Sequence, residues 1–378
     1  MVRYPGWRER WQPVRSARVL TLTALGLGFG GPAHDAVAQE DSSVSGITIE
    51  VDERVELMGV LFRLGGRGEY DMTQVPGWAD GVDEYFSPHA DHAAVEMAKR
   101  LAGPYGVGFF VPMNLAVHVT MPPALEERVP LESSGSLHRT WATHPDSTRA
   151  FLELARAFAR DSRFDRFMDG QRQVVDSTEA RLRRLVGDAI DVAWFEGFWG
   201  GDAAADFVLV PGLLNGRASY GVDYEGPHEE REFFAITGVT DVDAAGMPVF
   251  DPDFAGTIVH EFNHSFVNPL VDRHRAELQE VGEPLYETVA EAMRALRYGS
   301  WESMMLESLV RAAVVRYVAD HEGEDAAAEE SRAQVEAGFV WTPELVDLLQ
   351  RYEDRRDAYP AMDSFMPAIV AFFRTLIA

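Results

Sequence analysis

The segment Thr257-Ile-Val-His-Glu-Phe-Asn-His-Ser-Phe266 carries the strongest structural signal in this chain of 378 residues. His260 and His264 are four residues apart, so a helix projects both side chains from one face, one turn apart. The apolar residues of the segment fall on the opposite face: Ile258, Phe262 and Phe266. The pattern therefore predicts a helix whose apolar side is anchored in a core while its histidine side lines a cleft.

The two histidines have the spacing of a metal site. Two imidazoles one helical turn apart can bind one tetrahedral Zn²⁺. Glu261 lies about 100° further round the helix, where it can take a proton from water and later pass it to a leaving group. The chain contains no cysteine, so a transition-metal site must use histidines and carboxylates. We expect one Zn²⁺ per chain, with His260 and His264 as ligands and Glu261 as the catalytic base.

The flanking residues predict where this helix begins and ends. Asp251-Pro252-Asp253 offers an N-cap, a proline at the first helical position and an acid in the first turn. Asn268-Pro269 predicts the end, because proline disfavours helix before it. We therefore expect the site helix to cover residues 252–267.

A zinc site of this kind needs a third protein ligand. In metzincins, Gly and His follow the second histidine at three and six residues; Val267 and Leu270 stand at these positions, which excludes that class. His274 is one alternative ligand. The gluzincin arrangement takes a glutamate from a later helix instead, and the candidates are Glu287, Glu291, Glu302 and Glu307.

The positions of the first three glutamates on their helices argue against a role as a buried ligand. Glu287 and Glu291 lie opposite the apolar stripe of the helix expected over residues 284–298, and should face solvent. Glu302 falls in the first turn after a predicted Ser300 cap, where an acid suits the helix dipole.

Glu307 differs because its helix is apolar nearly all round. A buried carboxylate costs several kcal/mol unless a cation or hydrogen-bond donors satisfy it. The cation could be zinc, or it could be Arg311 at i+4 in a purely local ion pair. We predict that Glu307 is the third ligand and that Arg311 supports it without binding the metal.

Two motifs in this region resemble a known family. Val259-His-Glu-Phe-Asn-His-Ser-Phe-Val-Asn-Pro269, followed by Glu307-Ser-Leu-Val-Arg-Ala312, is similar to a domain-of-unknown-function family of exported bacterial proteins that is grouped with gluzincin-type metallopeptidases. The likeness runs from about residue 47 to the C-terminal helices. It implies a zincin-like fold, with His260, His264 and Glu307 as ligands and Glu261 as base.

A peptidase cleft also needs a strand to pair with substrate and a donor for the transition-state oxyanion. Either of two apolar segments, 207–210 and 233–236, could be the edge strand, or both could be core strands. The sequence does not choose among the possible oxyanion donors: Tyr220, Tyr224, His228, Tyr286 and Tyr298.

The N-terminal 38 residues have the order of a secretory signal peptide. Five arginines precede the apolar run 19–29, and Ala36-Val37-Ala38 is a small-x-small cleavage site. We expect cleavage after Ala38, a flexible lead-in over residues 39–46, and a secreted or periplasmic protein. The apolar run is too short to span a bilayer, and no later segment predicts a membrane span.

Composition and patterning predict a helix-rich α+β fold. The chain is 46% hydrophobic, enough for a large core. A small sheet precedes the site helix, and a C-terminal helical lobe covers residues 284–378. Residues 47–378 form the metallohydrolase domain, with a possible lobe boundary near 122–146. The formal net charge of −27 argues against nucleic acid, since phosphate binding needs a cationic surface.

Two functions fit these features. The first is an exported zinc-dependent hydrolase, a metallopeptidase acting on peptides or proteins. The second is a non-catalytic exported binding protein on the same fold, with a structural or vestigial metal site. The intact Glu261 favours the first, because a purely structural site does not need it. The sequence leaves the substrate and the oligomeric state open.

Overall fold

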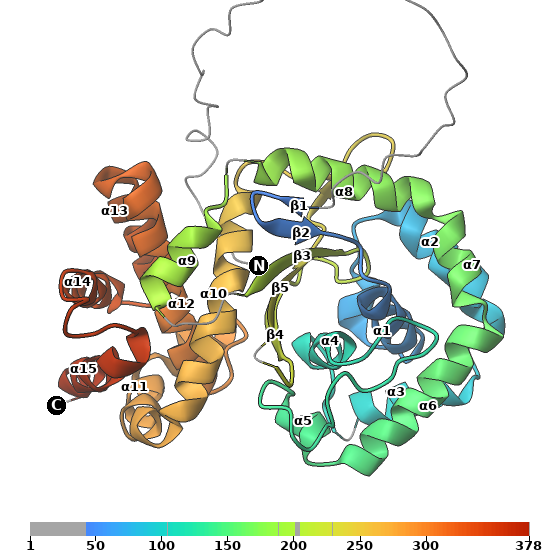
Figure 1. Ribbon diagram of the computed structural model, residues 1–378, viewed down its shortest axis with the longest axis horizontal. Coiled ribbons are helices and arrows are strands. Elements are labelled where there is room, and N and C mark those ends of the chain that lie inside the picture. Colours follow the sequence, from blue (N-terminus) through green and yellow to red (C-terminus); the bar gives the residue numbers. More distant parts are fainter. Residues whose placement is uncertain (1–42, 104, 188, 201–204, 229, 378) are drawn as a thin grey trace, which may run out of the picture.

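The computed structural model describes residues 43–103, 105–187, 189–200, 205–228 and 230–377. The predicted signal peptide, with its cleavage site after Ala38, lies outside these residues. The fold is α+β and helix-rich, as predicted, and its main sheet lies between two groups of helices (Figure 1). No helix in the described ranges is both long and apolar enough to span a bilayer.

The main sheet has five strands in the order β1-β2-β3-β5-β4. Its strands are Ser43–Val44 (β1), Ile47–Ile49 (β2), Asp206–Gly212 (β3), Tyr220–Glu225 (β4) and Arg231–Gly238 (β5). A separate ribbon pairs Asp241–Val242 (β6) with Pro248–Val249 (β7). β2, β3 and β5 run parallel, whereas β1 and β4 are antiparallel strands at the two edges. The two apolar segments 207–210 and 233–236 lie within β3 and β5, but β4 was not predicted.

The predicted flexible lead-in is wrong for its last four residues. Ser43–Val44 pairs with β2 through a two-residue turn, in which Ser45 and Gly46 both have positive φ. Such turns match the right-handed twist of a hairpin, which explains why this short polar segment joins the sheet.

Alternation along the strands divides the interior into two cores. Phe207, Leu209, Phe233 and Ala235 point into one core, and the residues between them point into the other. The N-terminal helices cover the core that contains the residues between these four: Glu53–Leu64 (α1), Pro76–Phe86 (α2), Ala93–Ala102 (α3), Phe110–Val117 (α4), Arg139–Ala142 (α5), Pro145–Asp161 (α6) and Phe164–Gly170 (α7). Arg172–Val186 (α8) contributes side chains to both cores. The sheet therefore separates the two cores, rather than the segment 122–146.

The other core holds the C-terminal helices, as Figure 1 shows. These are Val192–Trp199 (α9), Phe254–Arg273 (α10), Arg275–Ala295 (α11), Trp301–Glu322 (α12), Glu324–Glu336 (α13), Thr342–Glu353 (α14) and Met362–Leu376 (α15). The predicted C-terminal helical region is confirmed.

Two helical stretches begin or break at local irregularities. Ser87-Pro88 starts a 3-10 turn over Ser87–His89, and α3 begins only at Ala93. The chain is broken between α6 and α7, where Arg163 has φ +53°. A left-handed residue interrupts the hydrogen-bond ladder, and nothing in the amphipathic pattern signals it.

The site helix, α10, is longer than predicted at its C-terminal end. It begins at Phe254 rather than residue 252 and runs through Pro269 to Arg273. Proline removes one backbone hydrogen bond, but Leu270 and Val271 beyond it are 4% and 1% exposed. Burial of these two side chains favours continuing the helix, so the predicted stop at Asn268-Pro269 is wrong.

A buried carboxyl group holds the loop that leads into β4. Glu56 of α1 accepts hydrogen bonds from the backbone N–H of Leu213 at 2.7 Å and from the Trp78 indole at 3.0 Å. Burial raises the pKa of Glu56 to about 8, although both hydrogen bonds oppose this. α1 is thereby tied to the end of β3.

This shift predicts a pH dependence of stability. The folded state holds a proton on Glu56 up to about pH 8, whereas the unfolded chain releases it near 4.5. The free energy of unfolding should therefore fall, by the order of a few kcal/mol, as pH rises between these values. Glu56→Gln should flatten this slope in urea denaturation at pH 5.5 to 8.5. Glu84→Gln, on the exposed face of α2, should keep it; an unchanged slope in Glu56→Gln would contradict the assignment.

Candidate metal centre

α10 is fixed by its apolar face and by one buried amide. Ile258 and Phe262 are fully buried, as predicted from the sequence. Asn263, also fully buried, accepts a hydrogen bond from the Trp199 indole at 2.8 Å and donates to the Val259 carbonyl at 2.8 Å. The role of Asn263 was not foreseen from the sequence, although a polar residue on the buried side of a helix signals a partner.

The predicted ligands come together between α10 and α12. His260 Nε2 and His264 Nε2 lie 3.3 Å apart. Glu307 Oε2 is 3.6 Å from His260 Nε2, and Glu307 Oε1 is 3.5 Å from His264 Nε2. One ligand atom from each residue lies within 4.8 Å of the others, so this buried group could hold a metal ion.

α12 carries Glu307 into the core, as its apolar surroundings predict. Ser300 caps the helix by accepting a hydrogen bond from the Ser303 N–H, as expected from the sequence. Glu307 is 7% exposed. The helix packs against α10, α11, α13 and α14, which explains why it has no polar face.

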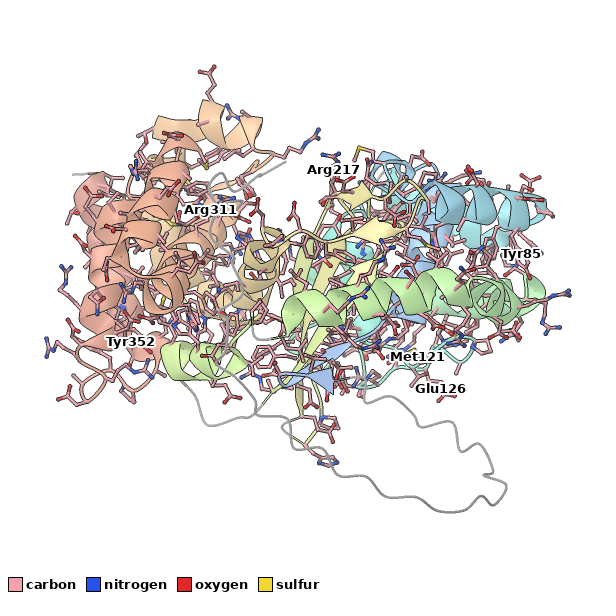
Figure 2. The ribbon with its side chains drawn as sticks, turned by 90° about the horizontal axis from the view of Figure 1, so that it is seen from above. Tyr85, Met121, Glu126, Arg217, Arg311 and Tyr352 are labelled. Carbon is pink, nitrogen blue, oxygen red and sulfur yellow. The ribbon has the colours of Figure 1, made fainter. Side chains whose placement is uncertain are left out.

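Arg311, one turn further along α12, supports Glu307 through a buried ion pair. Its Nε donates to Glu307 Oε2 at 3.0 Å, Nη1 donates to Gln334 of α13, and Nη2 donates to the Tyr298 hydroxyl at 3.0 Å. The guanidinium is 1% exposed and lies among the C-terminal helices (Figure 2). The predicted contact between Glu307 and Arg311 is confirmed; Gln334 was not foreseen.

Metal ligation needs neutral imidazoles and an ionised carboxylate, and the surroundings of Glu307 and His260 meet this need. Burial would raise the pKa of Glu307, but Arg311 and the two histidines hold it well below its usual value. Burial lowers the pKa of His260 to about 4. Burial also disfavours the charged form of His264, but its hydrogen bond to Glu307 outweighs this and raises its pKa.

Glu261 lies beside the triad and is 6% exposed. Burial raises its pKa to about 7, while the charge of His264 and a hydrogen bond from the Gly221 N–H oppose the shift. A carboxyl group that titrates near neutral pH is suited to accept and return a proton. The structure thus brings the predicted base and the three predicted ligands to one place.

The edge strand of this site is β4, not either predicted segment. β3 and β5 are inner strands, so neither 207–210 nor 233–236 forms an edge. β4 packs directly on α10: a Cβ added at Gly221 would overlap the Glu261 carbonyl oxygen and lie 2.5 Å from the Cβ of His264. Only glycine allows this approach. The position of β4 at the edge of the sheet depends on pairing with residues distant in the sequence, so the local sequence pattern does not reveal it.

One of the five candidate oxyanion donors lies at the triad. Tyr298 accepts from Arg311, and its hydroxyl is hydrogen-bonded to Glu307. Tyr220 packs against the core on the far side of the sheet from α10, and its hydroxyl is buried without a hydrogen-bond partner among the described residues.

The other three donors have different surroundings. Tyr224 lies in the opposite core, with Arg128 over its ring. Tyr286 donates to the Tyr298 carbonyl at 3.1 Å. His228 is exposed in the turn between β4 and β5.

The remaining ligand candidates lie apart from the triad. Glu287 and Glu291 are exposed, as predicted. Glu302 pairs with Arg275 of α11, and His274 Nε2 lies 3.2 Å from Asp363 Oδ1. These contacts leave Glu307 as the glutamate that joins the two histidines.

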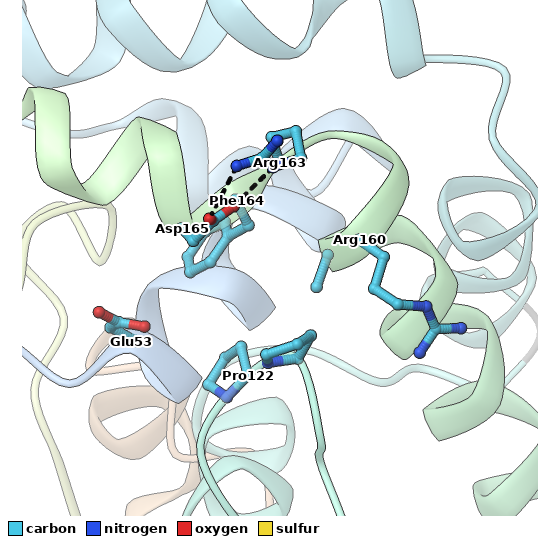
Figure 3. Close-up of a pocket in the computed structure, with 8 residues that line it drawn as sticks. Glu53, Pro122, Arg160, Arg163, Phe164 and Asp165 are labelled. Atoms are coloured by element: carbon cyan, nitrogen blue, oxygen red, sulfur yellow. Dashed lines mark hydrogen bonds and ion pairs between the residues drawn. The ribbon is translucent and has the colours of Figure 1, made fainter.

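A separate surface pocket of about 280 Å³ contains none of these side chains (Figure 3). It lies between α1, the α6–α7 junction and Pro122-Pro123, and Arg163 pairs with Asp165 at its rim. These helices cover the opposite face of the sheet from α10, so the pocket does not extend the metal centre.

Comparison with known families identifies a domain-of-unknown-function family over nearly the whole chain. Residues 47–372 match the family described as a domain of unknown function, DUF4932. The chain therefore belongs to that family. No curated protein matches it, and no solved structure does.

The triad predicts a specific loss of metal binding. After dialysis against Zn²⁺, the wild-type chain should retain about one ion, and Glu307→Gln should bind it at least about 100-fold more weakly because a charged ligand is lost. Elemental analysis and competition with a chelator measure this. Glu302→Gln, on the same helix but bonded to Arg275, is the control. Equal zinc affinity in both variants would exclude Glu307 as a ligand.

The contact between β4 and α10 predicts that Gly221→Ala destabilises the protein. The added methyl group must push the strand from the helix, at a cost of about 1–3 kcal/mol. Gly77→Ala is a matched control, because nothing lies within 4 Å of a Cβ added there. Urea denaturation compares the two. If Gly221→Ala were as stable as Gly77→Ala, the close packing would be refuted.

Proposed function

We propose that this chain is a zinc-dependent hydrolase with the ligand set of a gluzincin-type metallopeptidase. The supporting observation is the convergence of His260, His264 and Glu307 beside the buried carboxyl group of Glu261. A zincin-like fold and export through the N-terminal signal peptide are parts of the same proposal.

The spacing of the ligand atoms supports zinc as the metal. Zinc bonds of about 2.0–2.1 Å in a tetrahedron place neighbouring ligand atoms about 3.3–3.4 Å apart. Here the two imidazole nitrogens lie 3.3 Å apart, and each Glu307 oxygen lies 3.5 or 3.6 Å from one of them. Two imidazoles and one carboxylate are also a donor set that zinc uses in hydrolases. Arg311 keeps the carboxylate ionised and holds its orientation.

The protein groups have distinct roles in the proposed reaction. When bound, zinc acts as a Lewis acid and makes water acidic enough to react near neutral pH. Glu261 accepts the proton of the attacking water on a carboxylate oxygen and returns it to the leaving amine. The Gly221 N–H orients that carboxylate.

A peptide is the proposed substrate because β4 is an edge strand beside the base. An extended peptide can add to such an edge through backbone hydrogen bonds. The alternative of a closed structural site would require a fourth protein ligand. Within the described residues the group contains three, and His274 is engaged by Asp363.

Glu261→Gln tests the mechanism directly. The variant should bind zinc like the wild type but cleave a mixed peptide library about 100- to 10,000-fold more slowly, because the amide cannot accept the proton. Mass spectrometry of the products measures cleavage, and elemental analysis measures zinc. Asp253→Asn, at the residue that precedes α10, is the control. Undiminished cleavage by Glu261→Gln would reject this mechanism.

A further inference from the structure

Asp223 lies on the same face of β4 as the glycine that contacts the site. Successive side chains of a strand point to opposite faces. Val222 and Tyr224 belong to the core on the far side of the sheet, whereas Gly221 faces Glu261 and His264. Asp223 therefore points towards α10, about 6.8 Å along the strand from Gly221.

The outer edge of β4 near Asp223 is bounded by two occupied amides. The Gly221 N–H donates to Glu261, and the Glu225 N–H donates to the Ser136 hydroxyl at 3.1 Å. Both amides point away from β5, so the edge next to Asp223 lies between the base and Ser136. A peptide bound along this edge would place a residue two positions from the scissile bond beside Asp223.

The Asp223 carboxylate is buried without an ion pair of its own among the described residues. It is 9% exposed, and the hydrogen bond that it accepts comes from its own backbone N–H. Arg231 is the nearest opposing charge, but its Nε lies 3.6 Å from Glu225. Glu225 and Asp272 add negative charge.

Such a group is expensive to bury, since an unpaired carboxylate loses hydration that a cation would replace. Burial accordingly raises the pKa of Asp223 to about 7, with Arg231 opposing. The strand could carry an apolar residue here at lower cost, as it does at Val222. A cationic ligand would account for the carboxylate at this position.

We propose that Asp223 is a specificity subsite for a positively charged group of the peptide, either a lysine or arginine side chain or a free α-amino group. This inference rests on the proposed function, because the subsite would lie in the substrate cleft of the proposed hydrolase. The two sources share the same chemistry, a cation that donates hydrogen bonds to a carboxylate.

Binding to the zinc-loaded Glu261→Gln chain tests this without requiring cleavage. The probes are a capped alanine pentapeptide with a central arginine, its glutamine counterpart, and an uncapped alanine pentapeptide, measured by calorimetry. We expect the arginine or the uncapped probe to bind about 30-fold more tightly than the glutamine probe. The arginine probe identifies a side-chain subsite, and the uncapped probe identifies an α-amino subsite.

The variants separate Asp223 from the general negative charge. Adding Asp223→Asn to the Glu261→Gln chain should reduce its preference for the cationic probe over the glutamine probe to about threefold or less. Adding Glu225→Gln, on the same face of β4, should preserve that preference. Equal binding of all probes, or equal loss in both variants, would overturn the subsite. If Asp223→Asn does not fold, thermal stabilisation of the Glu261→Gln chain by each probe still decides whether a cation is preferred.

Cleavage by the wild-type chain is scored separately. Asp223-dependent binding without any cleavage would reject the hydrolase and retain the subsite. Cleavage that is indifferent to charge and to Asp223→Asn would retain the hydrolase and reject the subsite.

Discussion

The ionised Glu307 carboxylate between α10 and α12 is the interaction on which the C-terminal half depends. Its burial removes it from water, and the cost is recovered only if opposite charge and donors surround it. Arg311 supplies that charge, and Tyr298 and Gln334 hold the guanidinium in turn. Gln334 also donates to Glu330 of α13. A single carboxylate thus links the packing of three helices and keeps its two oxygens directed at the histidines.

A second constraint comes from the other side of the site. Gly221 lets β4 approach α10 closely enough for a backbone N–H to reach Glu261. The ligands therefore come from the C-terminal helices, while the orientation of the base depends on the sheet. Because Glu56 ties α1 to the end of β3, the N-terminal helices contribute to the position of β4 as well. The site needs both groups of helices, although one group carries all the ligands.

The centre of the site could be predicted from the sequence because its signals are local. The i, i+4 spacing of His260 and His264 fixes their common face, and the apolar surroundings of Glu307 imply burial. The remainder depends on long-range pairing. Nothing within residues 220–225 shows that this strand lies at an edge, so Gly221 and Asp223 were missed. The predicted end of α10 was wrong because the burial of Leu270 and Val271 outweighs the local effect of Pro269.

The separation of the ligands along the chain has a further consequence. His264 and Glu307 belong to different helices with all of α11 between them. A bound ion would close this segment into a loop and remove conformational freedom from the unfolded chain, as a disulfide does. The chain has no cysteine and therefore no disulfide, so coordination would supply a cross-link that disulfides cannot. Chelation would then act on folding as well as on chemistry, and exposure to protease could report metal occupancy without any substrate.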